Sequence, residues 1–271
     1  MIILADTCVL PRCHLEEAEI YRKKFGSGFG FELLPMFDLP EFEENLKANL
    51  SLFEGCPLFF HEPVWGVEHT APKGSKAYEN SMYHILLTKK YAEILHPSAM
   101  VYHLNNCSIP KGRKNQMLRN SLENLDEMRK LFPDVKLLVE NTGTDIEGNN
   151  ILDQAEFTAL CQTHDLEVLI DIGHANANSW NLYQLIDDLK DRARGFHFHN
   201  NDGCHDLHDP LHEGTIDIDR LLPFIQKTVP GAAWIIEYTH PIHHGAQLLE
   251  DLTFLMQYKN ADINDTNIHS V

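Results

Sequence analysis

Short apolar runs alternate with longer segments of helical period along the whole chain. Phe42, Leu46, Leu50 and Phe53, for example, recur at the spacing of one helical face. We expect strands at the apolar runs, which are residues 2–5, 30–34, 57–60, 99–103, 135–140, 166–171, 195–199 and 232–237. Each run is followed by an expected helix, at residues 15–24, 39–53, 75–95, 115–132, 154–164, 182–190, 217–227 and 247–258. The pattern is therefore a series of β-then-α units.

The repeated units predict a closed barrel. Their strands are too apolar to be half-exposed, which is typical of parallel strands covered by helices. An open, doubly wound sheet is the alternative, but it normally carries a glycine-rich phosphate-binding turn after an early strand, and this sequence has none. We therefore predict a single (β/α)8 TIM barrel over residues 1–260, followed by a polar C-terminal tail over residues 261–271.

Composition agrees with this fold and narrows the function. A length of 271 residues suits one barrel, which typically has about 250. The formal net charge of −18 disfavours nonspecific attraction to nucleic acid or to an anionic membrane. No apolar run reaches the roughly 20 residues that span a membrane. The cysteines form no CxxC pair, and the short apolar start meets Asp6 early, so we expect no signal peptide and a cytoplasmic protein with reduced thiols.

Residues able to bind a metal or transfer a proton stand at the C-terminal ends of most apolar runs. They are Glu32, His61, His103, Glu140, Asp171, His199 and Glu237. In a (β/α)8 barrel these ends converge on the face that carries active sites. The loop after the seventh run adds further imidazoles and carboxylates, among them Asp206, His208 and His212. Because both groups are common ligands of divalent cations, we predict a shared metal site. The alternatives are a solvated polar loop and single core residues with satisfied hydrogen bonds.

Five short motifs carry a family resemblance. They are Val139-Glu-Asn-Thr142, Ile170-Asp-Ile-Gly-His-Ala175, His199-Asn-Asn-Asp-Gly203, Asp206-Leu-His-Asp-Pro-Leu-His-Glu-Gly214 and Ile236-Glu237. In this order they resemble the xylose-isomerase-like TIM-barrel superfamily, which contains sugar and sugar-phosphate isomerases and epimerases and the related endonuclease IV. His212 departs from the pattern, because it stands where the family usually has the first glycine of a Gly-Glu-Gly turn.

The resemblance to the isomerases and epimerases implies that Glu140, Asp171, His199 and Glu237 bind one divalent metal. Three carboxylates and one imidazole form a hard site, which suits Mn²⁺ or Mg²⁺, with Zn²⁺ and Co²⁺ as alternatives. Glu140 and Glu237 would remove and return a proton at the carbon next to a carbonyl, while the metal stabilises the enediolate. The substrate would be a small-molecule sugar or sugar phosphate, and family members often form homo-oligomers.

Further residues are candidates for substrate contact. His174 resembles the substrate-contacting histidine of the family. Glu32 either hydrogen-bonds a sugar hydroxyl, caps a helix or faces solvent. Trp65 is expected in the wall of the pocket, with a core position as the alternative.

The resemblance to endonuclease IV implies a different function. That pattern uses three zinc ions and would add His61, His103, His174, Asp206 and His208 to the metal ligands. In a site with one metal, His61 and His103 would instead bind sugar hydroxyls. Asp206 and His208 would also bind an additional metal. In a site with one metal, they would instead contact its ligands without binding it.

The charges near the predicted site disfavour nucleic acid as a partner. The loop over residues 62–68 holds two carboxylates and one candidate wedge, Trp65, where a nuclease needs groups that grip phosphates. The segment Lys111-Gly-Arg-Lys114 is positively charged and favours a nuclease, although it equally suits a sugar phosphate or a solvated helix start. A non-catalytic sugar-binding barrel is disfavoured because both glutamates are present. We therefore predict a metal-dependent sugar isomerase or epimerase, with a multi-zinc phosphodiesterase as the alternative.

Overall fold

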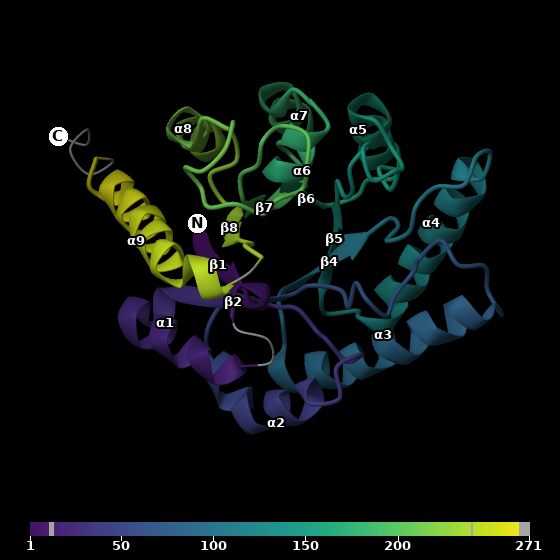
Figure 1. Ribbon diagram of the computed structural model, residues 1–271, viewed down its shortest axis with the longest axis horizontal. Helices are drawn as coiled ribbons and strands as arrows, with labels where there is room; N and C mark the ends of the chain where they lie inside the picture. Colours follow the sequence, from purple (N-terminus) through teal and green to yellow (C-terminus); the bar gives the residue numbers. More distant parts are fainter. Residues whose placement is uncertain (11–13, 240, 266–271) are drawn as a thin grey trace.

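A closed barrel of parallel strands forms the centre of the protein, as predicted (Figure 1). The computed structural model describes residues 1–10, 14–239 and 241–265. The strands are β1 (Ile2–Asp6), β2 (Phe29–Leu33), β3 (Leu58–Phe60), β4 (Ala99–His103), β5 (Lys136–Glu140), β6 (Val168–Asp171), β7 (Ala193–Phe198) and β8 (Ala233–Ile236). Each strand pairs with the next along the chain, and β8 pairs with β1 through Ile3 opposite Trp234, which closes the barrel.

Helices surround the strands and cover the outside of the barrel (Figure 1). They are α1 (Ala18–Phe25), α2 (Phe42–Phe53), α3 (Lys76–Leu95), α4 (Lys114–Leu131), α5 (Gln154–Thr163), α6 (Ile172–Ala177), α7 (Leu182–Leu189), α8 (Ile218–Thr228) and α9 (Pro241–Asp265). Polar side chains begin several of them: Ser75 accepts the Tyr78 N–H at α3, and Asp153 and Glu156 form a capping box at α5. None of the described helices is long and apolar enough to cross a membrane.

Two helices differ from the sequence prediction. The short helix α6 was not expected, and it begins directly after β6 because the Asp171 carboxylate accepts the His174 N–H at 2.6 Å. Helix α9 is longer at both ends than the expected segment over residues 247–258. It includes residues 261–265 of the expected tail, whose last part, residues 266–271, lies outside the described residues.

The alternation of side chains along each strand positions the polar residues. A compact apolar layer fills the barrel interior and consists of Leu4, Phe59, Ala99, Val101, Leu138, Leu169, Ala233 and Ile235. A second, larger apolar cluster packs between the strands and the helices. Residues two positions apart on a strand point to the same side, so Glu140 follows Leu138 and Asp171 follows Leu169 into the interior. The polar layer therefore lies directly above the apolar one, at the C-terminal ends of the strands.

Candidate metal and acid/base site

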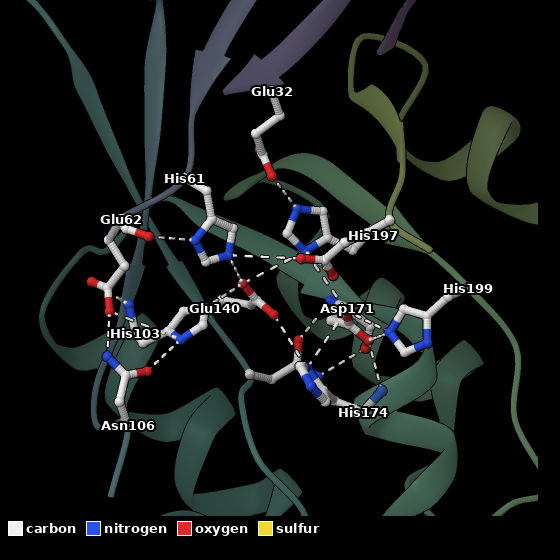
Figure 2. A network of polar contacts seen from close by, with 12 residues as sticks. Glu32, His61, Glu62, His103, Asn106, Glu140, Asp171, His174, His197 and His199 are labelled. Carbon is white, nitrogen blue, oxygen red and sulfur yellow. Dashed lines mark hydrogen bonds and ion pairs between the residues drawn. The ribbon is translucent and has the colours of Figure 1, made fainter. Parts of the chain in front are cut away.

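The polar residues predicted at the strand ends converge on one cavity. It has a volume of about 360 Å³, and its lining includes His61, His103, Glu140, His174, Asp206, His208 and Glu237. Asp171 and His199 are fully buried and contact these residues from below the cavity surface. Figure 2 shows the central part of this network, in which the side chains point toward one another. The nine residues of the predicted metal sites are thus brought together.

Three carboxylates surround a single imidazole nitrogen at the centre of the site. His197 Nδ1 lies 3.4 Å from Glu237 Oε2, 3.6 Å from Glu140 Oε2 and 3.6 Å from Asp171 Oδ2. The fourth predicted ligand, His199, places Nε2 3.0 Å from both carboxylate oxygens of Asp171. The four residues of the predicted metal site therefore share one small volume, and an imidazole that was not predicted lies among them.

His61, directly after β3, and His103, at the end of β4, approach Glu140. His103 Nε2 lies 3.0 Å from Glu140 Oε2, and His61 Nε2 lies 3.8 Å from the same oxygen. The two rings are nearly perpendicular, with centroids 4.7 Å apart. Because both reactive nitrogens face one carboxylate oxygen, these residues form a first group of convergent ligands beside the centre.

Asp206 joins two further imidazoles on the other side of the cavity. Its Oδ2 lies 3.1 Å from His174 Nε2 and 3.2 Å from His208 Nε2. The other ring nitrogen of His174 lies 3.2 Å from Glu140 Oε1, so His174 connects this group to the centre. His208 stacks on His199 with ring centroids 3.9 Å apart. Asp206, His174 and His208 therefore form a second group of convergent ligands.

Backbone carbonyls determine which nitrogen of His61 and of His208 carries the proton. Nδ1 of His61 lies 2.8 Å from the Glu62 carbonyl, and Nδ1 of His208 lies 2.9 Å from the Glu237 carbonyl. A carbonyl only accepts, so Nδ1 is the donor in both rings and Nε2 of the neutral ring has a free lone pair. Since each Nε2 faces a carboxylate, either a second proton or a cation must lie between them.

This arrangement of donors fits a divalent metal. Buried His174 Nδ1, His197 Nδ1, His199 Nδ1 and Asp206 Oδ1 have no hydrogen-bond partner within the described part of the chain. Ligand atoms within 4.8 Å of one another occur in several sets, including His61 with His103 and Glu140, and His174 with Asp206 and His208. Imidazole and carboxylate suit Mn²⁺, Co²⁺ and Zn²⁺. A bound cation would give such an atom a partner at His174 Nδ1, which lies 3.2 Å from Glu140 Oε1 and 3.5 Å from Asp171 Oδ2.

Opposite charges in the buried site shift several pKa values. Burial alone would lower the pKa of His103, but the carboxylates of Glu140 and Glu62 raise it to about 9. Against the same effect of burial, Asp206 and Glu237 raise the pKa of His208 to about 10. Burial would raise the pKa of Glu140, yet the imidazoles of His103 and His197 hold it well below its ordinary value. At neutral pH Glu140 is therefore ionised, and its charge is balanced by protons on these imidazoles or by a metal.

Of four further positions singled out in the sequence, Trp65 lies in the cavity wall as expected, and the other three lie outside the cavity lining. Glu32 is fully buried, so it neither faces solvent nor caps a helix, and its Oε1 accepts from His197 Nε2 at 2.7 Å. Trp65 lines the cavity but is 61% exposed, so it is not a core residue. His212 lies outside the cavity lining, 3.6 Å from Asp219. Lys114 pairs with the exposed Glu156 rather than facing the cavity.

Two residues of the site were missed. His197 is one, although the alternation Gly195-Phe-His197-Phe-His199 places both histidines on the same side of β7 and could have revealed it. Glu62 is the other: it is buried beside His61 and bonds to His69 and to the His103 backbone. It belongs to an irregular loop, where periodicity gives no signal.

A closed (β/α)8 barrel with an imidazole–carboxylate site at the C-terminal ends of its strands defines the class of this protein. The chain belongs to the family described as "Xylose isomerase-like TIM barrel", which matches residues 29–258. The predicted fold and family resemblance are thereby confirmed. No protein with a curated function matches the sequence.

Solved structures with this fold include both classes of protein named by the resemblance. A D-tagatose 3-epimerase-like protein is 17% identical, with a TM-score of 0.71 over 96% of this chain and 99% of its own. The IolI protein with a bound zinc atom is 16% identical, with a TM-score of 0.74 over the full length of both chains. Endonuclease IV from Thermus thermophilus is 18% identical, with a TM-score of 0.65 over 98% of this chain and 100% of its own. At these identities the likeness concerns the fold alone.

Proposed function

We propose that this protein is a divalent-metal-dependent sugar isomerase or epimerase. The observation that carries the proposal is the position of Glu140 and Glu237 at one cavity, each within 3.6 Å of His197 Nδ1. Glu140 ends β5 and Glu237 directly follows β8, and these two strands are not neighbours in the barrel. Two carboxylates on different walls suit a reaction in which one group removes a proton from a carbon and another returns one.

Different residues of the chain would bind the metal and transfer the proton in this reaction. Glu140, Asp171, His199 and Glu237 would hold the metal, and the many imidazoles around them favour Mn²⁺, Co²⁺ or Zn²⁺ over Mg²⁺. When bound, the metal supplies a Lewis acid that polarises the substrate's carbonyl and hydroxyl oxygens. Glu140 and Glu237 would transfer the proton at the carbon next to the carbonyl. This assignment needs an ionised carboxylate to remove the proton and a protonated partner to return one, and for Glu140 the lowered pKa provides the ionised state of the base.

The cavity suits a monosaccharide. Its volume of about 360 Å³ lies at the lower end of the range for small-molecule sites. Asn105, Thr142, Asn149 and Thr239 also line it and offer neutral hydrogen-bonding groups. We propose that these groups and His174 bind sugar hydroxyls, and that the exposed ring of Trp65 packs against the apolar face of the sugar. Glu32 would act on the substrate only through His197.

Proton exchange in deuterated water tests this function. The metal-loaded protein is incubated with a panel of ketoses and ketose phosphates, and deuterium uptake at the carbon next to the carbonyl is measured by NMR. Glu140→Gln and Glu237→Gln should each slow the exchange by about 10²–10⁴-fold. Glu213→Gln is the matched control, because Glu213 is an exposed carboxylate outside the cavity lining. Absence of label with every sugar, or undiminished exchange in both glutamine variants, would contradict the proposal.

A multi-zinc phosphodiesterase resembling endonuclease IV is the second candidate. Its support is the grouping of ligands around more than one point, with His61, His103 and Glu140 in one set and Asp206 with two imidazoles in another. Each set would hold an additional metal. Cleavage of DNA that contains an abasic site tests this candidate directly. Three tightly bound zinc ions, one of them lost in His208→Ala, would favour it, especially if no sugar exchanges a proton.

A further inference from the structure

Glu62 is a buried carboxylate outside the cavity lining (Figure 2). It is next to His61 in the chain, and its side chain contacts Asn106 and the backbone of His103. Its Oε2 accepts from His69 Nε2 at 2.7 Å and from the His103 backbone N–H at 3.1 Å. Its Oε1 accepts from Asn106 Nδ2 at 2.7 Å. The site thus has a buried carboxylate behind its imidazoles.

The orientation of the Asn106 amide follows from its partners. Nδ2 lies 2.7 Å from Glu62 Oε1 and 2.9 Å from the Val67 carbonyl, and both of these oxygens are acceptors. Oδ1 is therefore the atom that lies 2.8 Å from His103 Nδ1. Because an amide oxygen only accepts, Nδ1 of His103 must carry a proton. Glu62 therefore fixes the orientation of the Asn106 amide, and this amide fixes which nitrogen of the His103 ring carries the proton.

The same loop residue also determines the tautomer of His61. Its backbone carbonyl accepts from His61 Nδ1 at 2.8 Å. In both rings the proton is thus on the nitrogen that faces away from the cavity, and Nε2 points toward Glu140 Oε2, at 3.0 Å for His103 and 3.8 Å for His61. Hydrogen bonds of this kind behind a metal-binding imidazole set its tautomer and raise its basicity.

We propose that Glu62 is a positioning residue for metal binding, which through its backbone carbonyl and through Asn106 holds His61 and His103 with Nε2 directed at Glu140. The two imidazoles and Glu140 then bind a divalent cation. The hydrogen bond between Glu62 and His69 involves no candidate metal ligand. The further bond from Asn106 Nδ2 to Glu62 orients the amide whose Oδ1 accepts from Nδ1 of His103. This cation is additional to the metal that Glu140, Asp171, His199 and Glu237 are proposed to hold, so its binding can be measured independently of either candidate reaction.

Metal binding by purified variants tests the proposal without any substrate. Zn²⁺ bound per chain is counted after dialysis, and its dissociation constants are measured by competition with a chelator. His103→Ala identifies the metal that depends on this imidazole. Glu62→Gln should lower the affinity for that same metal by about 10–100-fold and leave the affinity for the other metals unchanged. Asn106→Ala should do the same while leaving the bonds of Glu62 to His69 and to the His103 backbone in place, which separates positioning from stability.

Glu68→Gln is the matched control. Glu68 lies in the same loop and accepts the Asn106 backbone N–H at 3.0 Å, but it does not reach the His103 ring. In Glu68→Gln, the dissociation constant of every bound Zn²⁺ should stay within about twofold of its value in the wild type. The proposal is wrong if Asn106→Ala keeps the affinity of the wild type, or if His103→Ala binds as many Zn²⁺ as the wild type does. Failure of sugar exchange alone would overturn the isomerase function and leave this result unaffected.

Discussion

Glu32 Oε1 and His197 Nε2 lie 2.7 Å apart, and both side chains are fully buried inside the barrel. The bond makes Nε2 the donor, so the opposite nitrogen of the same ring faces the carboxylates of Glu140, Asp171 and Glu237. Burial would lower the pKa of His197, but Glu237, Glu32 and Glu140 raise it well above its ordinary value. A charged imidazole therefore offsets part of the repulsion among these three carboxylates.

Removal of this imidazole should destabilise the protein strongly. In His197→Leu the Glu32 carboxylate loses its partner in the barrel interior, and an uncompensated buried charge costs about 3–5 kcal/mol. The double variant Glu32→Leu with His197→Leu should regain part of this loss, because it removes the unpaired charge as well. Urea unfolding of the chelator-treated proteins gives the free energies of unfolding. Additive effects of the two substitutions would contradict a direct energetic coupling.

The barrel and much of the site followed from sequence, because both depend on regular periods. Apolar runs and helical segments repeat with a spacing that specifies parallel strands covered by helices. Polar residues at the ends of such strands must meet, so His103, Glu140 and Asp171 could be placed without coordinates. His197 follows the same rule and could have been found by counting back two residues from His199.

Irregular loops set the limit of sequence prediction. Glu62 is next to His61, but its burial depends on the fold of the β3–α3 loop against the loop after β4, which no local pattern specifies. Glu32 occupies a strand end like the others, yet it is bonded to His197 instead of lining the cavity. Strand periodicity gives the side of the barrel on which a residue lies, whereas its partner depends on the packing of the neighbouring strands.

Trp65 should affect substrate affinity more than stability. The ring lines the cavity and is 61% exposed, so its removal leaves no large void in the core. Trp65→Ala should raise KM for the sugar by about tenfold, the effect of losing about 1.4 kcal/mol of contact, and should change the free energy of unfolding by less than about 0.5 kcal/mol. Trp65→Phe should restore part of the affinity. An unchanged KM in the alanine variant would exclude the proposed sugar contact.

Gly173 should tolerate no side chain, because His199 occupies the space beside it. A Cβ atom at this position would lie 2.0 Å from His199 Cε1, so the imidazole would have to move. Gly173→Ala should therefore weaken metal binding at the centre of the site by about tenfold or more, since displaced ligands lose their geometry. Gly231→Ala is the control, because nothing lies within 4 Å of its added Cβ. Equal Zn²⁺ affinity of both variants and the wild type would show that His199 is not a ligand.

The stability contributed by Glu62 should disappear in acid. The pKa of this carboxyl falls from an ordinary value of 4.5 to about 2 in the folded protein, because His69 and His103 outweigh the effect of burial. A lowered pKa stabilises the fold fully above pH 4.5, and this contribution is lost as the pH falls toward 2. A shift of this size corresponds to on the order of 3 kcal/mol. Glu62→Gln should therefore differ most from the wild type in free energy of unfolding near pH 5.5 and much less at pH 3.

Urea unfolding of the metal-free proteins at these two pH values measures the change. At each pH, the free energy of unfolding of the variant is subtracted from that of the wild type. This difference cancels the titration of the carboxylates that both proteins share. Glu62 also contributes, after Glu140, to the raised pKa of His103 of about 9, and the stability from Glu62's share is present below pH 6.5 and lost as the pH rises through 9. The advantage of the wild type should thus be greatest between about pH 4.5 and 6.5 and decline on both sides. A difference between the two proteins that does not vary with pH would mean that Glu62 contributes by packing and not by its charge.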